Sequence, residues 1–188
     1  MEKVLFATGN RGKVEEMQPL FGEKGYELEQ VQVDIEEIDA LDVETVAKRK
    51  AEDSFEEIDG DEPVIVEDTG FFVEPLGGFP GAKAAFFDRT VGAEGLLKLL
   101  EGESDRTAYF RTAIAFHDGS STRVFSASVD GQVPGEPRGE PHPHLPYDSL
   151  FVPWDGDGST FAERPELKEE ISHREKATRK FLDWLSSR

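Results

Sequence analysis

The stretch "KVLFATGNRGKVEEM", Lys3 to Met17, joins a short apolar segment to a helix-like segment through a Thr-Gly-Asn turn. The run "KVLFAT" is typical of a buried strand. Asn10 is placed to cap a helix, and Val14, Met17 and Phe21 then recur at helical spacing. A strand followed at once by a helix is a building unit of α/β domains, so this stretch predicts an α/β fold.

The first turn of that predicted helix carries two cations, Arg11 and Lys13, where the helix dipole already places partial positive charge. Backbone N–H groups at a helix start also form an anion site, and a bound phosphate would give both cations a partner. The alternative is that Asn10 only caps the helix and both side chains extend into water. A P-loop is excluded, because two residues separate Gly9 from Gly12 where that motif has four.

Hydrophobic patterns along the rest of the chain predict a mixed sheet with flanking helices. Strand patterns cover residues 26–35, 63–68 and 107–133, the last as two strands joined by the turn "HDGSS". Helical patterns cover residues 43–55, 92–102 and 172–185, and the last begins with the capping box Ser172–Glu175. Residues 136–148 are rich in Pro and Gly and predict a loop. Early βα units followed by an antiparallel hairpin favour a mixed sheet over a parallel one.

Composition bounds the class of protein. The chain has 188 residues, 37% of them hydrophobic and 14 of them Phe, which is enough to build the core of one domain. The absence of cysteine excludes a disulfide framework and a cysteine-ligated zinc site. No apolar run reaches the length of a membrane span, and the N-terminus lacks the pattern of a secretory signal. We therefore expect a cytoplasmic protein that does not enter membranes.

The charge balance is strongly acidic. The net charge is −19, from 40 acidic against 21 basic residues, and the acids are spread along the whole chain. Such a chain repels a polyanion at long range, so we expect no nucleic-acid partner. The surplus is interpreted as a solubility feature or as a halophilic-type acidic surface adapted to high salt, and an ordinary acidic protein is the alternative.

Two acidic segments predict a metal site. "VIVEDTG" places Glu67 and Asp68 at the end of a predicted buried strand, where a carboxylate can hold Mg²⁺ or take a proton from water. "VDIEEID" supplies Glu36, Glu37 and Asp39 beyond another strand. A magnesium ion that bridges phosphates uses one or two carboxylates together with water. The alternative is that "EDTG" is a polar surface turn in an acidic chain.

The last helix again begins with a cation at the end that the dipole disfavours. In "ISHREKA", Ser172 is explained as the cap, whereas His173 and Arg174 would aim donors out of the helix start toward an electron-rich group. Tyr147 and Asp148, after the Pro/Gly-rich loop, could add an aromatic face and an acceptor. The alternative for Tyr147 is a buried side chain that anchors the loop.

Taken in order, the motifs "TGNRGKVEE", "VEDTGFFVEPLGGFPG", "YDSLFVP", "TFAE" and "ISHREKA" resemble the inosine triphosphate pyrophosphatase family, the XTP/dITP pyrophosphatases of non-standard purine nucleotides. The resemblance spans nearly the whole chain. It implies one domain over residues 1–188, with an elongated mixed β-sheet, flanking helices and two lobes around a central cleft, usually as a homodimer. The implied reaction is Mg²⁺-dependent hydrolysis of ITP, dITP or XTP to the monophosphate and pyrophosphate, which cleans the nucleotide pool.

The resemblance also assigns catalytic and phosphate-binding residues by motif. Asp68 resembles the residue that binds Mg²⁺ and activates water, and Glu37, or else Glu36, matches a second metal carboxylate. Lys13 is expected to act in catalysis as well as binding. Residues expected to bind the triphosphate or contact the substrate are Thr8, Gly9, Asn10, Lys13, Lys50 and Thr69, with Arg11 at a variable position.

The base-binding side matches the family less completely. The residues that correspond to it are Tyr147, Asp148, Lys168, Ser172, His173 and Arg174. Leu145-Pro146 stands where the family usually has Phe-Gly, so the aromatic expected to stack on the purine is absent. Lys83 also stands where an aromatic is more common. Two alternatives therefore stay open, a pyrophosphatase with shifted or broad base preference and a nucleotide-binding module without turnover; intact Lys13 and Asp68 argue against the second.

Overall fold

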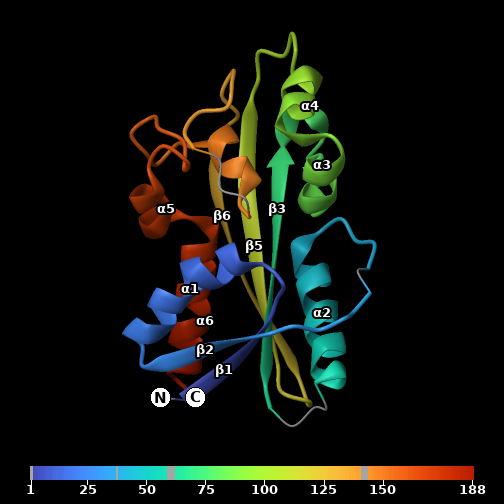
Figure 1. Ribbon diagram of the computed structural model, residues 1–188, viewed down its shortest axis with the longest axis vertical. Coiled ribbons are helices and arrows are strands. Elements are labelled where there is room, and N and C mark those ends of the chain that lie inside the picture. The colour runs from blue at the N-terminus through green and yellow to red at the C-terminus, as the bar shows by residue number, and fades with distance from the viewer. Residues whose placement is uncertain (1, 37, 59–61, 141–143) are drawn as a thin grey trace. The chain divides into compact units, whose positions relative to one another are not determined.

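The computed structural model describes residues 2–36, 38–58, 62–140 and 144–188, which form a mixed α/β fold (Figure 1). Seven strands make one sheet in the order β2-β1-β3-β5-β6-β7, with β4 paired to β3. The strands are β1 (Glu2–Ala7), β2 (Tyr26–Val31), β3 (Val64–Val73), β4 (Pro80–Gly81), β5 (Thr107–His117), β6 (Thr122–Gln132) and β7 (Val152–Pro153). The helices are α1 (Arg11–Glu23), α2 (Val43–Glu57), α3 (Ala84–Thr90), α4 (Gly92–Leu99), α5 (Pro165–Ile171) and α6 (His173–Leu185), with short 3₁₀ helices η1 (Glu74–Leu76) and η2 (Pro146–Leu150).

The pairing of the strands confirms the prediction of a mixed sheet. β1 runs parallel to both β2 and β3, with Val4 opposite Leu28 and Phe6 opposite Ile65. β7 runs antiparallel to β6, and β4 runs antiparallel to β3. The parallel strands at the start of the chain therefore share a sheet with antiparallel strands from its second half.

The chain divides into two compact units. The first comprises the residues up to Asp68 together with Thr112–Ala127 and Arg174–Arg188, and the second comprises Thr69–Arg111 and Ser128–His173. β3, β5 and β6 contribute residues to both units. The expectation of a single domain with two lobes around a central cleft stays a prediction.

The first unit is organised around a core contributed by α1, α6 and the strands. Asn10 caps α1, as predicted, since its side chain accepts a hydrogen bond from the Lys13 backbone N–H. Met17 and Phe21 of α1 are fully buried, and Phe21 packs against Phe181 of α6 with ring centroids 5.9 Å apart. α1 and α6 lie on one side of these strands and α2 on the other (Figure 1).

The second unit has a core rich in aromatic rings. Phe71 of β3 contacts Phe110 of β5 at 4.7 Å between ring centroids, and Phe151 packs edge-on against Phe110 at 4.9 Å. Leu96 and Leu100 complete this core from α4 and the residue after it. Because the rings interlock in tilted and edge-on arrangements, the strands of this unit are held by specific packing rather than by area alone.

Strand β3 corrects two interpretations of the motif "VIVEDTG". Glu67 and Asp68 were expected at the end of a strand or in a surface turn, but both lie within β3 and both are buried. Gly70 was misleading because glycine is common in turns. Here a Cβ on Gly70 would meet the backbone oxygen of Gly81 at 2.9 Å and the Phe72 ring at 2.5 Å. This glycine therefore permits the close approach of β4, not a turn.

The helices α3 and α5 are additions to the sequence-based description, each seven residues long. Among the described residues, no helix is both long enough and apolar enough to cross a membrane.

Candidate functional site

The residues assigned to the site from sequence fall into two groups, one in each unit. In the first unit lies the Asp68 group, which consists of Thr8, Gly9, Asn10, Lys13, Lys50, Asp68 and Arg174. In the second unit lies the Asp148 group, which consists of Thr69, Tyr147, Asp148, Lys168, Ser172 and His173. Glu37, expected as a metal ligand, lies outside the described residues.

The turn from β1 into α1 is held by its own side chains. The Asn10 backbone N–H donates to Thr8 Oγ1 at 3.1 Å, and the Lys13 backbone N–H donates to Asn10 Oδ1 at 3.3 Å. Between them, Gly9 is exposed, and a Cβ added there would meet no atom within 4 Å. Packing therefore does not require this glycine, whereas close approach of a ligand to the backbone would.

Asp68 combines burial with nearby cations. Lys50 Nζ lies 3.2 Å from Asp68 Oδ1. Oδ2 is also buried, and within the described part of the chain it accepts no hydrogen bond. Burial raises the pKa of Asp68 above its ordinary value, although the charges of Lys13 and Lys50 act to lower it. Such a carboxylate is suited to accept a proton or to bind a cation.

Glu67 lies next to Asp68 and links several elements of the first unit. Its side chain is fully buried and forms ion pairs with Lys13 through Oε2 and with Arg174 through Oε1, the latter at 3.1 Å. Lys13 Nζ also donates to the Glu67 backbone oxygen at 2.8 Å, and Thr112 Oγ1 donates to Oε1 at 3.2 Å. Arg174 in turn pairs with Glu16 of α1.

These pairs account for the cations at the two helix starts. Lys13 and Arg174 each have a carboxylate of the protein as partner, so their positions do not by themselves require a bound anion. Arg11 differs, because its side chain is exposed. This exposure is consistent with its place at a variable position of the motif.

In the second unit, Asp148 and Lys168 form a buried ion pair. Lys168 Nζ donates to Asp148 Oδ2 at 2.6 Å, and Lys168 Nζ lies 6.0 Å from the centroid of the Phe161 ring. Neighbouring Tyr147 is buried, and its hydroxyl donates to the Ala84 backbone oxygen at 2.8 Å, while burial raises its pKa. This geometry supports the alternative that Tyr147 anchors the loop, and a contact with a purine stays a prediction.

His173 and Ser172 end the second unit where α5 gives way to α6. The imidazole of His173 stacks on Phe110 with ring centroids 4.5 Å apart and an interplanar angle of 16°. Both residues are buried. Thr69 is half-buried on β3, directly after Asp68. The side chains of Asp148, Lys168, Tyr147 and His173 are therefore each held by contacts within the protein, and polar groups fixed in this way are what a site uses to discriminate among polar ligands.

The Asp68 group fits a magnesium ion bound together with phosphates. Among the described residues no cluster of three or more acidic, histidine or cysteine side chains could enclose a metal. Mg²⁺ bound with a nucleotide needs only one or two carboxylates, because phosphate oxygens and water complete its shell. Asp68 Oδ2 is the available carboxylate oxygen, and a cation there would compensate the burial of its charge. Glu36 is exposed, and any role of it as a ligand stays a prediction.

Sequence reasoning offered Glu67 only as a carboxylate of the metal segment, not as the partner of Lys13 and Arg174, and it did not assign a role to Glu16, Thr112 or Phe110. Glu67 carried a signal, since it is a charged residue that directly follows the apolar run "VIV". Glu16 carried a weaker one, three residues after Lys13 on the same helical face. Thr112 and Phe110 carried none, because only the pairing of β5 with β3 brings them to their partners.

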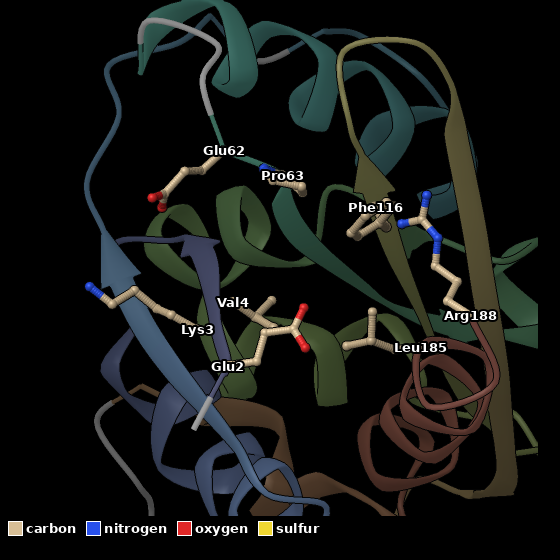
Figure 2. Close-up of a pocket in the computed structure, with 8 residues that line it drawn as sticks. All are labelled: Glu2, Lys3, Val4, Glu62, Pro63, Phe116, Leu185 and Arg188. Carbon is tan, nitrogen blue, oxygen red and sulfur yellow. The ribbon is translucent and has the colours of Figure 1, made fainter.

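A separate pocket of about 270 Å³ lies in the first unit and shares no residue with the Asp68 group (Figure 2). Its lining residues are Glu2, Lys3, Val4, Glu62, Pro63, Phe116, Leu185 and Arg188. Lys3 pairs with Glu29, and Arg188 pairs with Asp118. The cations of this pocket are thus compensated by the protein, and we assign it no function.

Comparison with known proteins gives one consistent result. The sequence model of the Ham1 family matches residues 4–184. A dITP/XTP pyrophosphatase from Thermococcus kodakarensis is 42% identical over 184 residues, covering 97% of this chain and 97% of that protein. A dITP/XTP pyrophosphatase from Methanopyrus kandleri is 42% identical over 187 residues, covering 98% of this chain and 97% of that protein.

Solved structures agree with the fold. A HAM1 protein from Coxiella burnetii superposes with a TM-score of 0.83 at 26% identity, covering all of both chains. The Ham1 protein of Staphylococcus aureus gives a TM-score of 0.81 at 26% identity, covering 99% of each chain.

Proposed function

This chain belongs to the Ham1 family, and from that premise we propose that it hydrolyses non-standard purine nucleoside triphosphates to the monophosphate and pyrophosphate. The substrates proposed are dITP and XTP, after the names of the relatives, together with ITP. One observation carries the proposal: buried Asp68, with its raised pKa, lies 3.2 Å from Lys50 in the unit that also holds Lys13. A module that only bound nucleotide would have no use for such a proton acceptor.

In the proposed reaction, Asp68 orients a water molecule and takes its proton. The water oxygen forms a bond to the α-phosphorus, and the bond from that phosphorus to the α–β bridging oxygen breaks. Pyrophosphate leaves with the electron pair of the broken bond. Lys13 and Lys50 hold phosphate oxygens and compensate the charge that develops on them. Asp68 would hold Mg²⁺ together with Glu37, the second carboxylate that the family resemblance implies, and the ion would neutralise charge on the phosphates.

We propose that the base is read by Tyr147, Asp148, Lys168, Ser172, His173 and Arg174. Inosine and xanthine present a 6-keto oxygen, an acceptor, where adenine presents an amino donor. Donors on His173 and Arg174 would be left facing the adenine amino group, and each lost buried pair costs about 1–3 kcal/mol. Leu145-Pro146 replaces the expected Phe-Gly, so the purine would stack more weakly on the protein. The second candidate function is therefore a pyrophosphatase with a broader base preference.

We also propose that the protein works as a homodimer in the cytoplasm. Support comes from large apolar side chains exposed on α3, α4 and the residue that joins them. Phe86 is 60% exposed, Val91 50% and Leu99 49%. Exposed apolar side chains of this size mark interaction surfaces when they form a patch. Sedimentation of the wild type and of Phe86→Glu tests this proposal, with a dimer expected only for the wild type.

The test of the activity is a panel of triphosphates. Purified protein is incubated with ITP, dITP, XTP, ATP, GTP and CTP, with Mg²⁺ or with EDTA, and pyrophosphate and monophosphate are both measured. Equal release of the two products from ITP, dITP and XTP, well above ATP and dependent on Mg²⁺, is expected. Cleavage of all six at similar rates favours the broad preference, and no release from any of them overturns the proposal.

A further inference from the structure

The carboxylate of Glu67 holds two cations to which the proposed function gives different tasks. Oε2 pairs with Lys13, which is expected to hold the phosphates, and Oε1 pairs with Arg174, which is expected to read the base. The glutamate side chain is fully buried, and those of Lys13 and Arg174 are 17% and 3% exposed. A single buried group therefore lies between a phosphate contact on α1 and a base contact on α6.

We propose that Glu67 is a positioning residue that couples Lys13 to Arg174. Contact of the base with Arg174 then changes how available Lys13 is to the phosphates. The inference rests on the proposed function, since it takes the two cations to be substrate contacts. Glu67 itself touches no reacting atom in this account. It acts by dividing one negative charge between two cations.

The coupling follows from the electrostatics of the shared carboxylate. In a buried site two ion pairs to one carboxylate interact, because each cation compensates part of the same charge. If Arg174 is withdrawn, the Glu67 carboxylate loses the charge compensation that Arg174 supplied and holds Lys13 more tightly. A phosphate must then compete harder for Lys13. When Arg174 stays in place, Lys13 is held more loosely and is more available to the phosphate.

The surrounding contacts favour positioning over simple charge compensation. Thr112 Oγ1 donates to Oε1 at 3.2 Å, and Glu16 pairs with Arg174 from α1. The backbone oxygen of Glu67 accepts a second hydrogen bond from Lys13 Nζ at 2.8 Å. Lys13 thus contacts both the side chain and the backbone of Glu67, and Arg174 contacts both Glu67 and Glu16, which restricts the positions that the two cations can take.

The test is a binding cycle with inorganic pyrophosphate, which has no base for Arg174 to read. Calorimetry in Mg²⁺ compares the wild type, Arg174→Ala, Glu67→Gln and the double variant. Arg174→Ala is expected to weaken pyrophosphate binding by about 2- to 150-fold, the range of coupling between contacting residues. The same substitution in the Glu67→Gln background is expected to change binding by less than about 2-fold.

Arg179→Ala is the matched control. It removes the same charge from the same helix, and Arg179 pairs with Glu175 and Glu23 rather than with Glu67. It should leave pyrophosphate binding unchanged, which separates coupling from a general loss of positive charge. Should Glu67→Gln fail to fold, Glu67→Asp keeps the charge but shortens the reach, and the effect of Arg174→Ala is again expected to shrink.

A second measurement excludes a merely structural role for Glu67. The values of kcat/KM for ITP and for ATP are compared between the wild type and Glu67→Gln. If the substitution only reduces the amount of folded protein, both rates fall alike and the ratio of kcat/KM for ITP to that for ATP stays unchanged. If it mispositions Arg174, that ratio falls. An equal effect of Arg174→Ala with and without Glu67, or no binding of pyrophosphate by the wild type, overturns the inference. If the wild type binds pyrophosphate but cleaves no triphosphate, the proposed function fails while the cycle still decides the coupling.

Discussion

At the scale of single residues, folding favours the neutral form of the Asp68 side chain, whereas the proposed reaction uses its charged form. Burial disfavours its charged form and raises its pKa above the ordinary 3.8, while Lys13 and Lys50 limit the rise. The folded protein therefore binds this proton more tightly than the unfolded chain does. Stability from this group is present below pH 3.8 and is lost as pH rises through the folded pKa. The charged form that burial disfavours is the one that the proposed reaction needs.

Replacing Asp68 by Asn separates these two requirements. Asp68→Asn keeps the shape but removes the proton acceptor, which lowers kcat by roughly 10²–10⁴-fold. In the absence of Mg²⁺ the same variant should melt at a higher temperature than the wild type at pH 7, and the difference should shrink toward pH 4. Exposed Asp183→Asn is the control for the loss of one charge. A near-normal kcat would sink the assignment of Asp68 as the base.

Gly9 allows a test of the phosphate cradle that spares the fold. A Cβ at this position meets no atom of the protein within 4 Å, so Gly9→Ala should leave the free energy of unfolding within about 1 kcal/mol of the wild type. If the backbone approaches a triphosphate here, the added methyl group should raise KM for ITP by roughly tenfold, the effect of about 1.4 kcal/mol. Steady-state kinetics and urea unfolding measure the two effects. An unchanged KM would place the cradle elsewhere.

At the scale of elements, β3 shows that a glycine inside a strand can be required by close packing rather than by a turn. Gly70 lies inside the strand, where a Cβ would meet the Gly81 backbone oxygen at 2.9 Å and the Phe72 ring at 2.5 Å. The Gly81 backbone of β4 cannot withdraw without loss of its pairing with Phe71. The space that Gly70 leaves is therefore required by packing, unlike the space beside Gly9.

This contrast predicts the effect of Gly70→Ala. Overpacking of a tight site typically destabilises a fold by about 1–3 kcal/mol, and we expect a loss in that range. Urea unfolding monitored by circular dichroism measures it, with Gly9→Ala as the matched substitution in open space. Equal stability of the two variants would contradict the close approach of β4 to β3.

The elements that the sequence predicted well are those with long periodic patterns. α1, α2 and α6 run for 13, 15 and 13 residues, and each buries an apolar face that repeats at helical spacing. α3 and α5 have seven residues each, which is too short for a period to be recognised. α5 still carried one signal, since Pro165 stands at its first position.

The site was predictable where a local motif carried it. Lys13, Lys50 and Asp68 were assigned from their motifs, and the structure brings Lys50 to Asp68. The ion pairs of Glu67 could not be predicted, because Arg174 is 107 residues away along the chain. Only tertiary packing brings such a pair into contact, and no periodicity reports it.

At the scale of the whole molecule, the dominant quantity is charge. The chain carries 40 acidic and 21 basic residues, a net charge of −19. Several of the cations are held in local pairs, among them Lys3 with Glu29 and Lys24 with Asp183. Each of these exposed pairs contributes little to the free energy of unfolding. The repulsion among the remaining acidic residues therefore acts on the stability of the molecule as a whole. Self-repulsion of this kind destabilises the compact state and is screened by salt.

The last prediction therefore concerns the melting temperature as a function of ionic strength. The Debye length falls from about 30 Å at 0.01 M to about 3 Å at 1 M salt, so repulsion between exposed carboxylates is removed over that interval. We expect the melting temperature to rise steeply from millimolar to a few hundred millimolar KCl and more slowly above it. Sucrose at matched osmolality is the control, because it favours burial without screening charge. A rise of the same size in sucrose would assign the effect to solvent exclusion, and a melting temperature that stays flat up to molar KCl would contradict the interpretation of the acidic surplus as an adaptation to high salt.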